Sequence, residues 1–243
     1  MAADTLFAID TAGEHCTLAL ARAGAVDLAR GAPGQTHLEH VMPMIEALFA
    51  RHGLAPAQCA AFAFGSGPGS FTGLRVACTI VQGLAYGAGR PVIAVGNLLA
   101  LAVRADERGA HGVRPRRVLA ARDARMNQAY AAVFEGSGTA WSTLVPPCLI
   151  DAGQLADIAA RWQPDYCAGD AAWLASWLGP AGRPAGLVLQ DVAVDAAVIV
   201  RLALERHARG EVLAPELALP EYVRNDVART VAQRRAALVA GAA

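Results

Sequence analysis

The chain has 243 residues with 21 basic and 21 acidic side chains, and every basic residue is arginine. The absence of lysine excludes a Walker-type phosphate loop and Schiff-base chemistry, because both need a lysine amine. A net charge of zero disfavours unaided nucleic-acid binding, since that affinity rests mainly on phosphate neutralisation. No segment reads as membrane-spanning and no secretory signal opens the chain, so the sequence predicts a cytoplasmic protein without a membrane partner.

The N-terminal part reads as three strands followed by alternating helices and strands. Apolar runs and period-two alternation predict the strands, and apolar spacings of three and four residues predict the helices. The predicted elements are strands over 6–10, 16–21 and 26–29, a helix over 35–52, a strand over 60–64, a helix over 74–86, a strand over 91–95 and a helix over 97–104. This order predicts a mixed α/β unit with a largely parallel core.

The pattern then restarts. Leu6, Ala8 and Asp10 correspond to Leu119, Ala121 and Asp123, and Ala19 and Leu20 then correspond to Ala132 and Val133. Further strands are predicted over 144–150, 165–169 and 187–190, with helices over 151–161, 170–178 and 194–209. We therefore expect a duplication, with halves over 1–104 and 105–243, a helix over 194–209 that returns to the first half, and a frayed tail after 228.

A glycine-rich string, Gly65 to Arg75, lies between a predicted strand and helix. Glycines there let the backbone approach a ligand closely, and the helix N-terminus is an anion site. The candidate phosphate contacts are Gly67, Gly69, Ser70, Gly73 and Arg75. The string matches neither the dinucleotide fingerprint nor the nucleophile elbow. A tight strand-to-helix crossover that needs small residues is the alternative.

Polar residues at the strand ends offer a second candidate site. Asp10 and Asp123 end corresponding strands, where carboxylates could hold magnesium against nucleotide phosphates; capping of their own turns is the alternative. His37 and His40 lie one helical turn apart, but two imidazoles without a third ligand make a poor metal site. Two groups of arginines could contact phosphates, although solvated surface is their commoner role. They are Arg114, Arg116, Arg117, Arg122 and Arg125, and the tail residues Arg224, Arg229, Arg234 and Arg235.

The two long helices of the first half carry unusually apolar surfaces. The second has no charge from Val76 to Tyr86, which indicates burial on more than one side. Each helix could simply lie between a sheet and a neighbour, or form an exposed patch for association. The candidate partner and dimer surface consists of Leu38, Val41, Met44, Ile45, Leu48, Leu74, Val76, Ile80 and Leu84.

Several motifs together resemble the bacterial TsaB (YeaZ) family, the non-catalytic subunit of the machinery that forms tRNA threonylcarbamoyladenosine (t6A). They are the runs 6–11, 42–44 after His40, 67–75, 123–126 and 220–225, of which the string Gly-Pro-Gly-Ser-Phe-Thr-Gly is the most specific. The resemblance extends to about residue 228. It implies a duplicated RNase H-like fold of the actin-like and sugar kinase-like type, in agreement with the repeat.

The resemblance also implies partners and a role. It implies a paralogous catalytic threonylcarbamoyltransferase subunit, a small ATPase subunit, tRNA through the complex, and a homodimer when the chain is alone. The catalytic relative binds metal through a histidine pair where this chain reads Val95-Gly96-Asn97-Leu98, so we expect no catalysis, no metal and no required cofactor, with magnesium nucleotide a candidate ligand at the interface. The alternatives are an autonomous small-molecule kinase or ATPase, and a peptidase or chaperone-like regulator.

Overall fold

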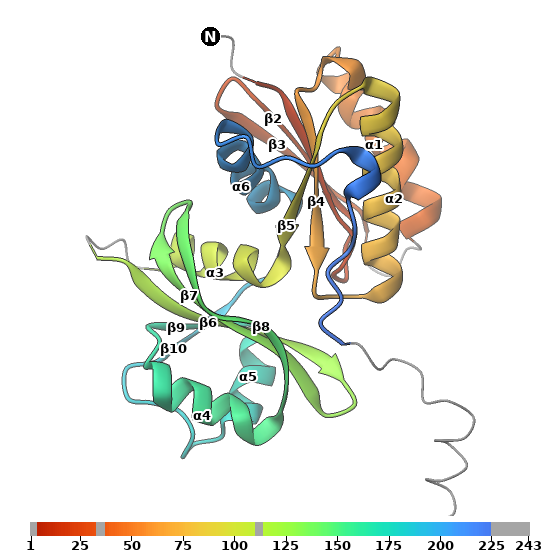
Figure 1. Ribbon diagram of the computed structural model, residues 1–243. Helices are drawn as coiled ribbons and strands as arrows, with labels where there is room; N and C mark the ends of the chain where they lie inside the picture. Colours follow the sequence, from red (N-terminus) through yellow and green to blue (C-terminus); the bar gives the residue numbers. More distant parts are fainter. Residues whose placement is uncertain (1–3, 33–36, 110–113, 225–243) are drawn as a thin grey trace, which may run out of the picture.

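The computed structural model describes residues 4–32, 37–109 and 114–224, with backbone alone for 37–39. The first half comprises β1 (Leu6–Asp10), β2 (Thr17–Arg22), β3 (Ala25–Arg30), α1 (His37–Arg51), η1 (Pro56–Gln58), β4 (Ala61–Gly67), α2 (Phe71–Ala88), β5 (Val92–Gly96) and α3 (Asn97–Arg108). The rest comprises β6 (Arg116–Arg125), β7 (Gln128–Ser137), β8 (Ala140–Asp151), α4 (Ala152–Trp162), β9 (Tyr166–Gly169), α5 (Ala171–Leu178), β10 (Val188–Asp191), α6 (Ala196–Ala208) and η2 (Pro215–Leu217) (Figure 1).

The two halves repeat one sheet order. The first sheet runs β3-β2-β1-β4-β5 and the second β8-β7-β6-β9-β10, each with an antiparallel meander joined to parallel strands. This is a duplicated RNase H-like α/β fold, as predicted. The residue correspondence is wrong by one in the second strand: Ala8 lies opposite Ala19, but Ala121 lies opposite Ala131 and not Ala132. The second hairpin connection is one residue shorter, which shifts the register.

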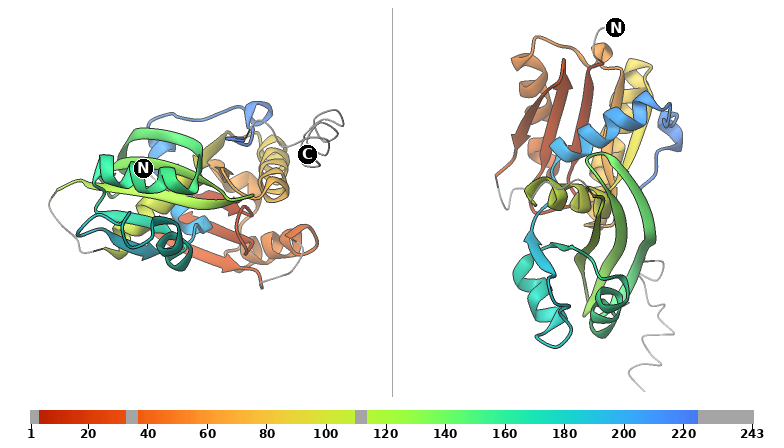
Figure 2. Two further views of the ribbon diagram at one scale, coloured as in Figure 1. Left: turned by 90° about the horizontal axis from the view of Figure 1, so that it is seen from below. Right: turned by 90° about the vertical axis from the view of Figure 1, so that its left-hand side faces the viewer.

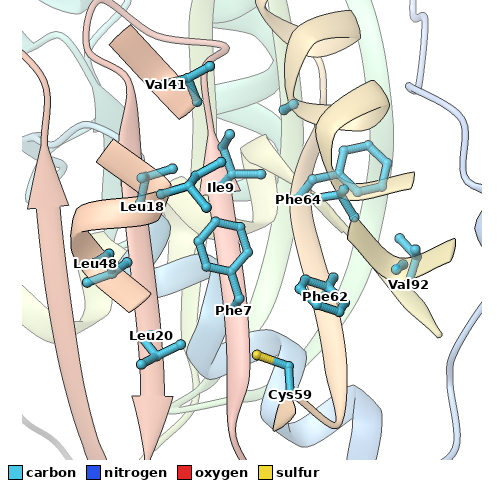
Figure 3. Close-up of a cluster of buried hydrophobic side chains, with 14 of the residues drawn as sticks. Phe7, Ile9, Leu18, Leu20, Val41, Leu48, Cys59, Phe62, Phe64 and Val92 are labelled. Carbon is cyan, nitrogen blue, oxygen red and sulfur yellow. The ribbon is translucent and has the colours of Figure 1, made fainter. Parts of the chain in front are cut away.

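Helices cover both faces of the first sheet (Figures 1 and 2). On one face, α1 and α2 pack on a core that includes Phe7, Phe62 and Phe64 (Figure 3). On the opposite face, α6 packs on β1, β2, β4 and β5, with Ile199 in the same cluster as Leu6. Helix α6, from beyond the second sheet in sequence, therefore completes the core of the first half, and α3 lies between the two sheets. Within the described residues, no helix has both the length and the apolarity to span a membrane.

After α6, residues 210–224 form an extended segment, here called the strap, which crosses the first half and reaches the second (Figure 1). Leu213 forms a two-bond antiparallel bridge with Val92 at the free edge of β5. Gln82 of α2 donates to the carbonyl of Ala218 at 3.0 Å. Arg224 donates to the carbonyl of Ala124, at 3.0 Å, in the second half. The strap thus joins α2, the edge of the first sheet and the β6–β7 turn. The predicted frayed tail lies outside the described residues.

Candidate functional site

The glycine-rich loop between β4 and α2 packs against the chain's own backbone. A Cβ at Gly67 would lie 2.6 Å from the carbonyl oxygen of Glu221 in the strap, and one at Gly73 would overlap the carbonyl oxygen of Thr11. Gly67 also has a φ of 127°, in the range that favours glycine. Glycine is required at these positions for close packing within the chain. The tight crossover, one of the two interpretations of the sequence, therefore explains them.

Some hydrogen-bond donors of the same loop are also satisfied within the chain. The backbone N–H of Ser70 donates to the carbonyl of Ala12 at 3.1 Å. The hydroxyl of Ser70 accepts from the N–H of Gly73 at 3.3 Å, which makes Ser70 the N-cap of α2. A Cβ at Gly69 would lie 2.7 Å from the Cβ of Ala12. An anion would have to compete with these contacts, and the phosphate role of this loop stays a prediction.

Asp10 lies beneath the loop and is 1% exposed. Its Oδ1 accepts a hydrogen bond of 2.8 Å from Nδ2 of Asn97, whose own Oδ1 accepts from the N–H of Gly67 at 2.7 Å. Burial raises the pKa of Asp10, and the hydrogen bond from Asn97 and the charge of Arg122 partly offset that effect. A magnesium ligand needs an open face toward the ion and its waters, so this enclosed geometry does not support the predicted magnesium role.

The two aspartates that end corresponding strands have different surroundings. Asp123 has a side chain that is 39% exposed, and its Oδ1 accepts from the N–H of Arg125 at 2.8 Å. Asp123 therefore caps its own turn, as the alternative interpretation stated. The side chain of its neighbour Arg122 instead donates a hydrogen bond of 2.6 Å to the carbonyl of Ala12 in the first half. Burial lowers the pKa of Arg122, while the negative charge of Asp10 raises it.

The outer face of α2 is the second candidate site. Six of its residues recur at helical spacing on one stripe, here called the α2 stripe, and each is exposed or half-exposed: Thr72, Val76, Thr79, Ile80, Gly83 and Gly87. None is charged. Nothing within 4 Å would meet a Cβ at Gly83 or Gly87. The neighbouring Tyr86 is 80% exposed, and Arg75 lies over the exposed ring of Phe71, 4.6 Å from its centre.

The structure narrows the predicted partner surface. Val41, Ile45, Leu48 and Leu74 are all buried in the core of the first half, and Figure 3 shows Val41 and Leu48 directed toward β1 and β2. Since these side chains already pack against the sheet, they cannot form a partner surface as predicted. Met44, Val76, Ile80 and Leu84 remain partly exposed. The side chain of Leu38 lies outside the described part of the chain.

A metal site receives no support from the described residues. His40 is exposed, whereas the side chain of His37 is not described. Among the residues that the structure describes, no group of three His, Cys, Asp or Glu side chains is placed to hold a metal ion.

Two groups of residues shape this region through contacts that the sequence did not predict. Asn97 directly follows β5, and this position at a strand end could have marked it as a candidate site residue. Its hydrogen bond to Asp10, however, joins residues 87 positions apart. Glu221 and Tyr222 of the strap were predicted only as part of the family motif 220–225, without any contact. Tyr222 packs on Phe71 with ring centres 5.4 Å apart. Nothing periodic in the sequence of residues 210–224 indicates these contacts.

Comparisons with known proteins agree with this architecture. The family model for TsaD, tRNA N6-adenosine threonylcarbamoyltransferase, matches residues 33–176. The chain is 33% identical over 238 residues to the tRNA threonylcarbamoyladenosine biosynthesis protein TsaB of Escherichia coli (strain K12), covering 92% of this chain and 96% of that protein. It is 46% identical over 126 residues, or 52% of each chain, to TsaB of Haemophilus influenzae.

Solved structures give the same result. YeaZ from Pseudomonas aeruginosa matches with a TM-score of 0.78 at 32% identity, covering 90% of this chain and 99% of that one. A second Pseudomonas aeruginosa structure, described as similar to the peptidase YeaZ, has a TM-score of 0.78 at 34% identity, covering 91% of this chain and 100% of that one. With nearly the whole length matched at such identity, the chain belongs to the TsaB (YeaZ) family of tRNA threonylcarbamoyladenosine biosynthesis proteins.

Proposed function

We propose that the chain is the scaffold and activating subunit of t6A formation. In this role it binds the paralogous catalytic subunit, which transfers threonylcarbamoyl from its adenylate to the adenosine beside the tRNA anticodon. The observation that carries the proposal is the uncharged α2 stripe, whose six residues stay exposed or partly exposed among the described residues. Membership of the TsaB family supplies the pathway.

The α2 stripe has the properties of a helix-packing surface. Val76 and Ile80 provide apolar area, and Gly83 and Gly87 have no side chain, so a second helix could approach the backbone of α2 closely. A paralogue with the same fold would present an equivalent helix, and a second copy of this chain would present α2 itself. We therefore place both the heterodimer and the homodimer on this face, as alternatives that exclude each other. Half-exposed Leu84, four residues after Ile80, extends the surface, and half-exposed Met44 of α1 stays a separate candidate contact.

The enclosed strand end supports a non-catalytic role. In the catalytic relative, the resemblance places metal-binding histidines where this chain has Asn97. Here Asn97 is fully buried and bonds to Asp10 and to the N–H of Gly67. The chain's own atoms thus occupy the region where an autonomous kinase would need its magnesium nucleotide. We infer that tRNA and the small ATPase subunit act through the assembled complex, in the cytoplasm.

Reconstitution tests this function. Purified catalytic paralogue, small ATPase subunit, tRNA and threonylcarbamoyl adenylate are combined with or without this chain, and t6A is quantified in the digested tRNA. We expect formation of t6A only when the chain and its paralogue are both present. Formation of t6A by the paralogue at an unchanged rate without the chain would contradict the scaffold role. Nucleotide turnover by the chain alone would favour the kinase alternative.

A further inference from the structure

A cavity of about 340 Å³ lies between the halves, on the side of the first sheet where the strap runs. Its walls include Ser66 and Gly96 at the ends of β4 and β5, Phe134 in β7, Arg206 in α6, and Leu219 and Glu221 in the strap, with further residues from α3 and β8. None of the residues that line it belongs to α2. The cavity is therefore separate from the α2 stripe.

The position of the cavity is one at which α/β proteins commonly bind ligands. After β4 the chain crosses to the face of the sheet covered by α1 and α2, whereas after β5 it enters α3 and the opposite face. Such a change of side opens a crevice outside the carboxyl ends of two adjacent parallel strands. Ser66 and Gly96 mark this crevice, because they lie at the carboxyl ends of β4 and β5.

Two opposite charges face this space and are held by different parts of the backbone. Arg206 donates to the carbonyl of Ala94 in β5. Glu221 is fixed by its own N–H, which donates to the carbonyl of Ser66 at 2.7 Å. Among the described residues, no carboxylate forms an ion pair with Arg206. Burial raises the pKa of Glu221, and the charge of Arg206 partly offsets this effect, so the two groups influence each other without touching.

The rest of the lining is mainly apolar. Phe134 of the second half and Leu219 of the strap both line the cavity. The volume falls at the lower end of the range for small-molecule sites, which is roughly 300–1,000 Å³. A ligand of this size that satisfies both charges must carry one anionic and one cationic group close together, together with a short apolar part.

We propose that this cavity binds a small zwitterion of the α-amino acid class. Its carboxylate accepts hydrogen bonds from Arg206, its ammonium group donates to Glu221, and its aliphatic side chain lies against Phe134 and Leu219. This inference does not depend on the proposed function, because the site uses no residue of the α2 stripe. Since Tyr222 follows Glu221 and packs on Phe71 of α2, the strap connects the cavity to the end of that helix.

Calorimetric titration of the full chain tests the proposal with three related probes. L-valine carries both charges, N-acetyl-L-valine lacks the ammonium group, and L-valinamide lacks the carboxylate. We expect Glu221→Gln to lower the affinity for L-valine at least tenfold, equivalent to about 1.4 kcal/mol. The affinity for N-acetyl-L-valine should stay unchanged. Arg206→Gln is expected to lower the affinity for L-valine and to leave the affinity for L-valinamide unchanged. Glu216→Gln, on the same strap but outside the cavity lining, is the matched control and should bind L-valine as the unmodified chain does.

Several outcomes would overturn the proposal. They are no binding of L-valine by the unmodified chain at millimolar concentrations, equal effects of Glu221→Gln on L-valine and N-acetyl-L-valine, and an equal loss in the Glu216→Gln control. The thermal transition shows whether each site variant folds. If one does not fold, the other variant tests the proposal with its own two probes. No paralogue is present in the titration, so a negative result here leaves the proposed function untouched.

Discussion

The carboxylate of Asp10 lies directly against the backbone of Gly65, so that a Cβ at residue 65 would overlap Oδ1 of Asp10 and lie 2.9 Å from Nδ2 of Asn97. In a nucleotide site, Asp10 and Gly65 would both face the ligand. Here they contact each other instead. The contact joins the end of β1 to the end of β4 and encloses the carboxylate. This contact is one reason why the loop needs glycine for packing within the chain.

A methyl group at position 65 should therefore disturb the fold. We expect Gly65→Ala to lower the free energy of unfolding by about 1–3 kcal/mol, as for other overpacked sites. Gly83→Ala makes the same chemical change in a helix, where nothing lies within 4 Å of the new Cβ. It should raise stability by up to about 1 kcal/mol through helix propensity. Urea denaturation of both variants measures the difference, and equal effects would contradict the close packing at Gly65.

The buried carboxylate also predicts a pH dependence. The pKa of Asp10 is raised in the folded chain above its ordinary value of 3.8, so the folded state binds this proton more tightly than the unfolded state does. The contribution of Asp10 is thus most favourable at low pH and declines as pH rises through the raised pKa. Relative to Asp10→Asn, the unmodified chain should lose stability as the pH rises above the ordinary pKa of 3.8.

The control for this prediction is Asp123→Asn, at an exposed carboxylate that ends the corresponding strand. A constant difference between the unmodified chain and Asp10→Asn would show that Asp10 does not have a raised pKa.

Asn97 should be the most sensitive polar residue of the strand-end network. Asn97→Ala removes the donor to Asp10 and the acceptor for the N–H of Gly67, and both of these partners are buried. Each unsatisfied buried group costs about 1–3 kcal/mol, so we expect a total loss of about 2–6 kcal/mol. Denaturant unfolding gives the value. Thr79→Ala, at an exposed position of α2, should change stability little; similar losses in the two variants would contradict the network.

The sequence predicted the elements better than their contacts. The run from Leu6 to Asp10 ends where β1 ends, and the repeat at Leu119 marks β6 correctly. The shift at Ala131 could not be predicted, because the length of a hairpin connection leaves no periodic signal. Apolar spacing showed that α2 is apolar all round, but which side the sheet covers depends on residues distant in the chain.

The role of the glycines was beyond the sequence for a related reason. Glycine permits close approach whether the neighbour is a ligand or the chain itself. At Gly67 the neighbour is Glu221, far along the chain and in a segment without periodicity. The two interpretations could therefore be separated only by the tertiary contacts of the strap.

The most direct test of the central claim is the affinity of this chain for its catalytic paralogue when the α2 stripe carries a charge. Gly83→Glu places a carboxylate on the stripe where the chain has open space, and Gly153→Glu makes the same change in α4 of the second half, where a Cβ also meets nothing within 4 Å. We expect Gly83→Glu to keep its thermal transition and to lose binding by at least a hundredfold, about 2.7 kcal/mol, while Gly153→Glu binds as the unmodified chain does. Unchanged affinity of a folded Gly83→Glu variant would contradict the proposed interface.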